Sequence, residues 1–600
     1  MLKRIRNMKK LVYSVLAIAA LFAAVSCEKN LDIPQKGVVP IESFYQTDAD
    51  AEAAITAAYA RFATRITGQD GSSIYTDYKA ALNNCGDDMY AAGSNFGDND
   101  FMAQLDEFRL DSGNQVVDHF YSNLFQVNYA CNLVIDNFKD GLPNGGQTAT
   151  TKRVVAEARV MRAYIYFLLT ALWNCPPMID HVIADGLPYN SDNAENEKPM
   201  SHNDLFKWVA SECEAAAADL DERKSPTDKD GAVKVTKGFA WAVQGKALLF
   251  AGDAAGAKSA LEKVINSGKY ELVPGEKFAD LFHVEGDCNE EKIFEANIEY
   301  NTGIGAWGGM IQRSTWMEAN IWNWRSDHFV AGASPQSKYT GGVDGWGGLG
   351  VPRWFGDEFF ANDDHSFRFD ATLKHIDDAV YGMEYSSDEI NAMSLEEKKV
   401  SDKIGIADPQ DGLYGQSFWL PFKQLVRKTD AGAYGNNVRL NNGIIMRYAE
   451  VLLLHAEACL ATGDAAGALK DINAIQKRAG SKTISAAATM DVLKKEKSYE
   501  LWLEGSRWLD LLRWGDTDRV KQAGSAVPKL FDKVHRAPKS GETPIWENGT
   551  EANSRFYIVE THEAKDKGYT VGFQAGKHEF FPYPTSVMDK NPNLIQNPGW

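Results

Sequence analysis

The chain contains few cysteines, and their spacing forms no recognisable metal-binding pair. Only seven of the 600 residues are Cys, and no Cys-x-x-Cys motif is present, so we expect no structural metal held by sulfur. Basic residues are also scarce, since 63 Lys and Arg stand against 82 Asp and Glu and the formal net charge is −19. This balance argues against nucleic acid and anionic lipid headgroups as partners. No long apolar run occurs after residue 27, so no later segment is predicted to span a membrane.

The first 26 residues have the pattern of a removable export signal. A basic stretch precedes the apolar run 11–25, which is too short to cross a bilayer as a permanent helix. The sequence Ala24-Val25-Ser26-Cys27 resembles a lipobox, which implies cleavage before Cys27 and acylation of its thiol and new amino group. The alternative is an ordinary signal peptide followed by an incidental cysteine. We therefore expect a lipoprotein signal peptide over residues 1–26 and a tether over residues 27–47.

Several stretches have the periodicity of amphipathic helices. Residues 48–65 begin with a good helix cap, Asp48, and continue with strong helix formers. A second helix begins near Val154 and is stopped by Pro176-Pro177, and a third is expected over about 203–220. Apolar residues of the second helix recur at steps of four and three, which places them on one face: Val154, Ala158, Met161, Ile165, Leu168 and Leu172.

An internal repeat gives the strongest indication of the fold. The sequence Gly-Asp-Ala-Ala-Gly-Ala occurs at 252–257 and again at 463–468. Gly is expected to end one helix and Asp to cap the next, so each copy predicts a helical hairpin. The expected helices are 234–251 with 254–267 and 444–462 with 465–479; a third pair is expected within 151–222, and 488–515 would begin a fourth.

Small residues in the turns and aromatic residues in the first helices are typical of tetratricopeptide repeats, although the spacing is not a regular 34 residues. We therefore predict a mainly α fold, a tetratricopeptide-like scaffold of helical hairpins that carries long, loop-rich insertions.

Two segments differ from this scaffold in composition. The insertion 300–443 is rich in Gly, has little helical periodicity, and holds seven of the fifteen tryptophans. Segment 68–101 is smaller and combines Tyr and Phe with Asn, Asp and Gly. The expected organisation is a helical region over 48–299, a ligand-binding insertion over 300–443, and C-terminal helical repeats over 444–600, all within one intertwined domain.

Four further stretches form a pattern along the chain: 156–167 with Leu172-Trp173; 235–241 with 251–253 and 264–270; 446–454 with 500–515; and Phe581-Pro-Tyr-Pro584 with 591–600. In order and spacing, these stretches together resemble the SusD/RagB family of outer-membrane nutrient-binding lipoproteins. His455, Glu496-Lys497 and Trp600 depart from the usual family residues at positions that belong to the scaffold. The resemblance implies a SusD-like protein on the outer face of the outer membrane. It would cover a SusC-like TonB-dependent transporter and deliver oligosaccharides to it, with peptides or another nutrient as the alternative ligand.

The two aromatic segments contain the residue types that bind sugars. Indole and phenol rings offer rigid apolar plates to the C–H faces of a sugar, while polar side chains fix its hydroxyl groups. The candidate platforms and their polar partners are Tyr75, Asn95, Phe96, Trp316, Trp322, Trp324 and Trp346, and the candidate hydroxyl clamps are Arg325 and Asp327. The competing interpretation is that most of these rings form a local core beneath long loops.

No motif in the sequence proposes catalysis. Acidic and basic residues that could suggest paired catalytic acids occur at helical spacing, where ion pairs and caps are the simpler interpretation: Glu157, Arg159, Arg162, Glu500, Glu504, Arg507 and Asp510. We predict a binding protein rather than an enzyme, with no catalytic residues. A secreted glycoside hydrolase, which needs two carboxylates across a sugar cleft, is the less favoured alternative, and a pure interaction scaffold is another. No cofactor is expected, although Asp98, Asn99 and Asp100 could hold calcium or form an ion-free turn.

Overall fold

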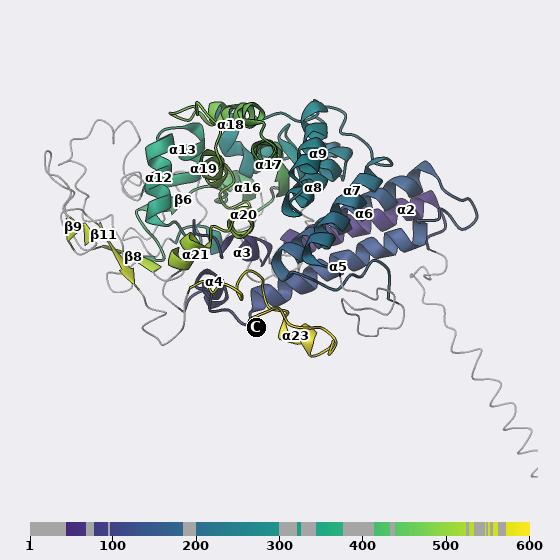
Figure 1. Cartoon of the computed structure of the whole chain (residues 1–600), viewed down its shortest axis with the longest axis horizontal. Helices are drawn as coiled ribbons and strands as arrows, with labels where there is room; N and C mark the ends of the chain where they lie inside the picture. Colours follow the sequence, from purple (N-terminus) through teal and green to yellow (C-terminus); the bar gives the residue numbers. More distant parts are fainter. Residues whose placement is uncertain are drawn as a thin grey trace, which may run out of the picture.

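The computed structural model is built mainly from α-helices (Figure 1). It describes residues 44–67, 77–93, 97–183, 200–298, 321–325, 344–375, 413–431, 439–523, 527–532, 546–547, 550–551, 556–561 and 572–600. Within these residues no helix is both long enough and apolar enough to cross a membrane. The six described cysteines are free thiols, and Cys213 and Cys459 are buried in helices as small apolar residues.

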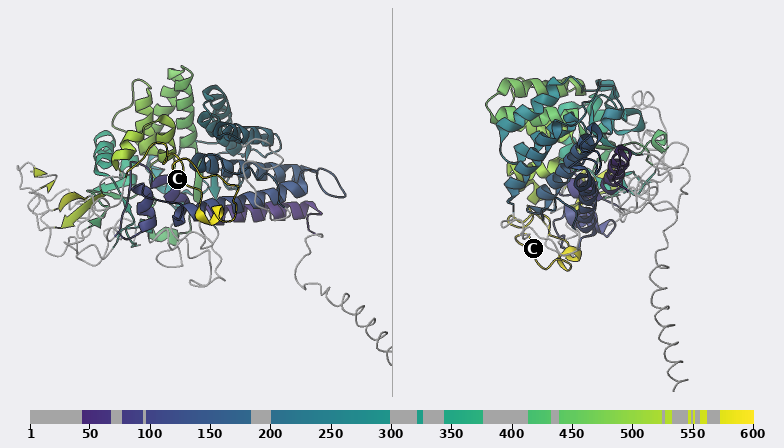
Figure 2. Two further views of the ribbon diagram at one scale, coloured as in Figure 1. Left: turned by 60° about the horizontal axis from the view of Figure 1, so that its bottom comes forward. Right: turned by 90° about the vertical axis from the view of Figure 1, so that its right-hand side faces the viewer.

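The long helices pack side by side as consecutive antiparallel neighbours. α2, α5 and α6 run alongside one another, followed by α7, α8 and α9, and α17 to α19 continue the array (Figures 1 and 2). The principal helices are α2 (Asp48–Thr67), α3 (Asp77–Asn83), α4 (Asp100–Asp106), α5 (Gln115–Phe138), α6 (Ala149–Trp173), α7 (His202–Ala217), α8 (Lys237–Phe250), α9 (Ala254–Asn266), α12 (Arg353–Asp363), α13 (Phe367–Thr372), α17 (Tyr448–Ala461), α18 (Ala465–Ala479), α19 (Met490–Glu500), α20 (Arg507–Trp514) and α21 (Thr517–Ala523). Shorter ones are α16 (Lys428–Ala431), α23 (Thr585–Met588) and the 3-10 turns η2 (Asp230–Ala232), η3 (Gly275–Phe282) and η4 (Val284–Gly286).

The repeated Gly-Asp-Ala-Ala-Gly-Ala motif forms the two hairpin turns that its sequence predicts. Gly252 and Gly463 have φ values of 83° and 81°, a left-handed conformation that ends α8 and α17 without the steric cost of a Cβ atom. Asp253 and Asp464 then accept hydrogen bonds from the backbone N–H groups three residues later, both at 2.9 Å, and so cap α9 and α18. The helical-hairpin prediction is confirmed.

Two predicted helices have different boundaries in the structure. The helix expected over 444–462 begins only at Tyr448, because residues 443–447 form strand β7 and pair with strand β2. The segment 488–515 is two helices, α19 and α20, rather than one. Leu503 and Gly505 lie between them with φ values of 60° and 80°, and this left-handed backbone breaks the helical hydrogen-bond ladder.

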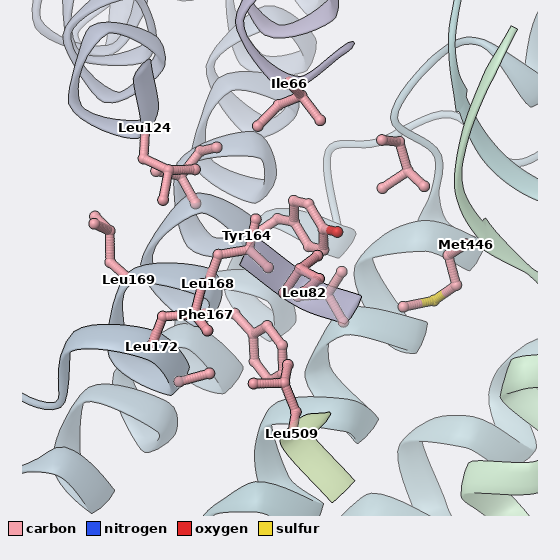
Figure 3. Packing of buried hydrophobic residues seen from close by; sticks show 14 of the residues in the cluster. Ile66, Leu82, Leu124, Tyr164, Phe167, Leu168, Leu169, Leu172, Met446 and Leu509 are labelled. Carbon is pink, nitrogen blue, oxygen red and sulfur yellow. The ribbon is translucent and has the colours of Figure 1, made fainter. Parts of the chain in front are cut away.

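One large apolar core joins the helical array to the segments around it. Figure 3 shows Tyr164, Phe167 and Leu168 of α6 close to Leu82 of α3 and Met446 of β7, and all five are buried. The core therefore connects parts of the chain that are more than 200 residues apart, and it supports the region where the two aromatic segments lie.

The strands are short and form small antiparallel sheets. β2 pairs with β7, so the chain returns to the same place before and after the 300–443 insertion. The other described pairings are β1 with β3, β4 with β6, β9 with β10, and β8 with both β5 and β11. Their bounds are β1 (Tyr90–Ala91), β2 (Lys292–Ala296), β3 (Leu349–Gly350), β4 (Leu373–His375), β5 (Leu413–Tyr414), β6 (Trp419–Pro421), β7 (Gly443–Arg447), β8 (Val527–Asp532), β9 (Trp546–Glu547), β10 (Thr550–Glu551) and β11 (Phe556–Thr561).

A buried cluster of arginines and carboxylates, here called the Arg–Glu network, connects these elements. Arg447 at the end of β7 bonds to Glu291, Glu500 and Glu504, each at 2.6 Å, and all four side chains are at most 10% exposed. Buried charges require such partners, because an unpaired ion in the interior carries a large desolvation cost.

Two further arginines complete the network around Glu500. Arg478 of α18 and Arg368 of α13 also bind this carboxylate, Arg368 at 3.1 Å. Burial alone would raise the pKa of Glu500, but the guanidinium groups of Arg478, Arg447 and Arg368 hold that pKa well below its usual range. The carboxylate is therefore ionised at neutral pH, and its contribution to stability is lost only as the pH falls below the unfolded-state pKa.

We predict that Glu500→Ala destabilises the fold strongly. The substitution leaves three buried guanidinium groups without a shared partner, and breaking buried pairs of this kind costs about 3–5 kcal/mol. Lys207→Ala is the control, because it removes an exposed ion pair with Asp204 that is worth at most about 1 kcal/mol. Urea denaturation followed by circular dichroism measures both variants. Equal midpoint shifts would show that the network does not support the fold.

Candidate ligand-binding site

The two aromatic segments singled out in the sequence lie together in the structure. Backbone N–H groups of Gly345, Gly347 and Gly348 donate to the carbonyls of residues 324, 323 and 321 at 2.6–2.7 Å. Gly348 in turn accepts from the N–H of Ala92 at 3.0 Å, next to the β1–β3 pair. Residues 90–93, 321–325 and 344–350 thus form one hydrogen-bonded layer, which we call the loop layer.

Glycine is required where this layer packs most closely. A Cβ atom on Gly350 would lie 1.8 Å from the carbonyl oxygen of Gly415, and Gly415 itself has φ of 72°. The chain after β5 therefore passes directly over β3, and Gln416 donates to the Leu349 carbonyl at 2.7 Å. The high Gly content of the insertion is partly a packing requirement.

Several of the predicted site residues lie outside the described residues. They are Tyr75, Asn95, Phe96, Trp316 and Asp327, together with the predicted lipidation residue Cys27. The predictions for them remain sequence-based.

Trp322 and Trp324 are held in the interior of the loop layer. Their exposed fractions are 7% and 3%, so their rings pack against the protein rather than face solvent. The indole N–H of Trp324 donates to the Pro421 carbonyl at 2.7 Å, and the Lys79 ammonium lies 5.9 Å from the centre of the Trp322 ring. In the described part of the chain these two rings form the floor of the loop layer, as the competing core interpretation supposes.

Trp346 and Arg325 occupy more open positions on the same layer. Both are half-buried, and a guanidinium nitrogen of Arg325 lies 3.6 Å from an Asp98 carboxylate oxygen. This contact joins the two aromatic segments through their side chains as well as their backbones. Trp346, Arg325 and Asp98 therefore combine a ring with polar groups, the arrangement that a sugar site needs.

The three residues considered for calcium have other contacts in the structure. Asp100 accepts from Gln104 at 2.7 Å and from Arg109 at 2.5 Å, and Asn99 donates to the Ala92 carbonyl at 3.0 Å. Asn99 has φ of 53° and precedes α4. These bonds attach the segment to the backbone beside β1 and to Arg109, and the calcium alternative remains a sequence-based prediction.

A cavity that the sequence did not suggest opens between α3, β7 and the α19–α20 turn. Its lining is apolar on one side and carries amides and charged groups on the other. The lining residues are Ile66, Tyr78, Lys79, Leu82, Asn83, Ile298, Gln424, Arg439, Asn441, Asn442, Gly443, Ile444, Ile445, Leu503, Glu504 and Gly505. The polar run Arg439-Leu-Asn-Asn442 before β7 is the signal that could have indicated it.

The polar groups of the cavity are fixed by neighbouring bonds. Arg439 donates to the Asn441 carboxamide oxygen at 2.5 Å, and Asn441 donates to the Phe282 carbonyl at 3.1 Å. Lys79 donates to the Gln424 carboxamide oxygen at 2.8 Å. The same Lys79 ammonium group also lies over the Trp322 ring. Lys79 therefore lines the cavity and also contacts Trp322 in the floor of the loop layer.

Two of the eight described non-glycine residues with positive φ line the cavity. Gln424 and Leu503 both line the cavity, and both have positive φ, 65° and 60° respectively, although neither is Gly. Such conformations cost free energy, so they persist only where surrounding contacts hold them in place, and they cluster at functional sites. The Gln424 side chain donates to the Leu503 carbonyl at 3.2 Å, so a hydrogen bond connects the two strained residues.

The carboxylate that lines the cavity is ion-paired. Glu504 accepts from Lys423 at 2.6 Å as well as from Arg447, and burial lowers the pKa of Lys423 to about 8. Burial alone would raise the pKa of Glu504, but Arg447 and Lys423 lower it. Burial raises the pKa of Tyr78 to about 12, so its hydroxyl is protonated at neutral pH. The cavity thus offers neutral hydroxyl and amide groups beside the ion-paired carboxylate of Glu504.

The carboxylates that might have suggested catalysis are ion-paired in the structure. Glu157 pairs with Arg153, and Asp510 pairs with Lys497 and Arg513. The basic residues considered with them are also paired: Arg159 and Arg162 with Glu212, and Arg507 with Asp87. The pairs with Glu212 join α6 to α7, and the pair of Lys497 with Asp510 joins α19 to α20.

Comparisons with known proteins agree with this architecture. A sequence model of the SusD family matches residues 320–600. The chain is 25% identical to SusD-like protein P2 of Formosa agariphila over 84% of this chain and 91% of that protein. It is 23% identical to a SusD-like protein of Bacteroides ovatus over 98% of each chain.

Solved structures with the same fold cover almost the whole chain. A laminarin-binding SusD-like protein superposes with a TM-score of 0.67 at 19% identity, covering 93% of this chain and all of that one. Surface glycan-binding protein A from Bacteroides thetaiotaomicron, in complex with laminarihexaose, gives a TM-score of 0.65 at 18% identity, covering 92% of this chain and all of that one. Residues 320–600 therefore match the SusD family, and the chain as a whole shares the fold of these SusD-like proteins.

Proposed function

We propose that this protein is a cell-surface lipoprotein that binds oligosaccharides and passes them to a SusC-like TonB-dependent transporter in the outer membrane. One observation carries the proposal: the two aromatic segments meet in a single layer, and Lys79, which lines a cavity with fixed amide and hydroxyl groups, also lies over Trp322 of this layer. Names of related proteins that refer to laminarin and surface glycans support the same ligand class.

The contacts suit an uncharged polyhydroxyl ligand. Trp346 supplies an accessible ring, while Arg325 and Asp98 supply a donor and an acceptor beside it. Tyr78, Asn441 and Gln424 offer further polar groups in the cavity, where rigid groups lower the ordering cost of binding. We include the undescribed Tyr75, Asn95, Phe96, Trp316 and Asp327 in the same site on sequence grounds.

A peptide or another nutrient is the alternative ligand. Affinity electrophoresis distinguishes a glycan ligand from a peptide ligand. The purified protein is run against a panel of polysaccharides that includes laminarin. Retardation by at least one glycan supports the proposal. If no glycan retards the protein and calorimetry detects peptide binding, the ligand is a peptide rather than a sugar.

We predict that Trp346→Ala weakens glycan binding roughly fivefold. The reason is the loss of about 1 kcal/mol of ring contact, and adding Arg325→Ala should weaken binding further. Isothermal titration calorimetry with a retained oligosaccharide measures both effects.

The matched control for this experiment is Trp241→Ala, which removes another half-buried indole, on α8 of the helical scaffold. It should leave the affinity unchanged. If the two Trp variants bind equally well, the loop layer is not the ligand site.

We also propose that the protein lacks hydrolytic activity toward its ligand. A retaining or inverting glycosidase needs two carboxylates that face each other across the sugar, whereas Glu500, Glu504 and Asp510 are all engaged by basic side chains. We predict no release of reducing sugar from any retained glycan after prolonged incubation. Release that disappears when one carboxylate is changed to its amide would identify an enzyme instead.

The anchor is the remaining part of the proposal. We predict that Cys27→Ala moves the protein from the membrane fraction to the soluble fraction and abolishes incorporation of labelled palmitate, because the acylated thiol is lost. Glycan retention by the released protein should be unchanged. Membrane association that survives the substitution would mean that Cys27 is not the attachment point.

A further inference from the structure

A second pocket, of about 370 Å³, lies between α12, α19, α20 and α21 (Figure 1). Among the described residues it shares no lining residue with the cavity that Lys79 lines. Small-molecule sites in proteins have volumes of about 300–1,000 Å³, so the pocket is large enough to hold a ligand. Its lining includes the buried Leu511 and Ser498, the half-buried Trp354 and the exposed Arg519. An apolar base, a partly accessible ring and polar groups thus meet in one place.

Trp354, near the start of α12, supplies the ring. It packs against the large core and against Phe355, with ring centroids 5.8 Å apart. On the pocket, the guanidinium group of Arg519 lies 4.5 Å from the centre of the Trp354 ring. A ligand that stacks on this indole therefore has to displace Arg519.

Arg519 is held over the ring only weakly. Its side chain is 54% exposed, and its nitrogens lie 3.8 Å from a Glu358 oxygen and 3.9 Å from an Asp87 oxygen. Both distances are longer than a hydrogen bond, and a cation–π contact at an exposed site is weak. Displacing the guanidinium group from the ring is therefore inexpensive.

The charges of the pocket favour an uncharged ligand. Four cations and four carboxylates line it. Lys494 pairs with Asp516 at 2.6 Å and Lys495 with Glu358 at 3.0 Å, so a charged ligand would have to compete with existing ion pairs. A hydroxyl group can instead use the remaining N–H donors of an ammonium group and the remaining lone pairs of a carboxylate.

We propose that this pocket is a second glycan-contact site, separate from the loop layer. A sugar ring replaces Arg519 on Trp354, and its hydroxyl groups bind the paired side chains of Lys495 and Glu358. The inference rests on the proposed function for its ligand class, but it assigns different residues to the contact.

The pocket is attached to the loop layer through the β1–β3 pair. Arg507, a lining residue, donates to Asp87 at 2.7 Å, and Asp87 lies three residues before β1. Trp354 follows Gly350 of β3 by four residues and Trp346 by eight. Eight residues of extended chain span at most about 29 Å, so the two tryptophans are no farther apart than this. One long glycan can therefore contact both sites.

Fluorine NMR of the full mature chain labelled with 5-fluorotryptophan tests the proposal. The signals of Trp354 and Trp346 are assigned by their loss in Trp354→Phe and Trp346→Phe. Laminarihexaose, maltohexaose and xylohexaose are then titrated separately, and at least one of them should shift the Trp354 signal to saturation.

The two signals separate this proposal from the proposed function. A shift of both supports both sites, and a shift of Trp354 alone supports the second site while removing the loop layer as a ligand site. A shift of Trp346 alone overturns the second site and leaves the proposed function intact. If neither signal shifts with any of the three sugars, the second site is overturned, and affinity electrophoresis still decides the proposed function.

Arg519→Ala tests the displacement step. Removing the guanidinium group uncovers the ring, so the sugar that shifts the Trp354 signal should bind there about two- to fivefold more tightly, the fold equivalent of an exposed cation–π contact.

Arg353→Ala is the matched control, because it removes another arginine that stacks on a ring, Phe418 at 5.1 Å, from the same helix as Trp354, and Arg353 does not line the pocket. It should leave the affinity at Trp354 unchanged, and thermal unfolding should show that both variants are folded. Unchanged or weaker binding in Arg519→Ala overturns the proposal, as does an equal gain in Arg353→Ala.

Discussion

The Arg–Glu network is the constraint on which the rest of the structure depends. Glu291 precedes β2 and Arg447 ends β7, so their ion pair joins the two ends of the 300–443 insertion to the helical scaffold. Glu500 brings α18 and α19 to the same point through its arginine contacts. Buried charges tolerate only a narrow range of geometries, because each misplaced group would be left desolvated and unpaired. The network therefore determines where the insertion begins and ends.

The candidate site lies directly beside this rigid centre. Glu504 belongs both to the network and to the cavity wall, and the strained Leu503 precedes it. A scaffold stabilised by buried ion pairs and a large core can hold residues in unfavourable backbone conformations, which an isolated loop could not. Loops carried on such a support can vary in sequence without changing the helical array beneath them.

The tryptophans of the insertion illustrate two uses of the same residue type. Trp322 and Trp324 are buried and support the loop layer, with the Trp324 N–H satisfied by a backbone carbonyl. Trp346 remains half-buried beside Arg325, where one part of the ring can still meet a ligand. Aromatic side chains have a large apolar area and a polar edge, so they suit both roles, and composition alone does not separate them.

The amino-acid sequence by itself determined the helical hairpins, because caps, glycine turns and apolar periodicity act over a few residues and were visible in the two copies of Gly-Asp-Ala-Ala-Gly-Ala. It also indicated which two segments carry the aromatic residues. Tertiary structure alone decided the start of α17 after β7, the break between α19 and α20, and the side chains that face the cavity. Those features depend on contacts between residues far apart in the chain, such as Lys79 with Gln424 and Arg447 with Glu291, and no local pattern specifies such pairs.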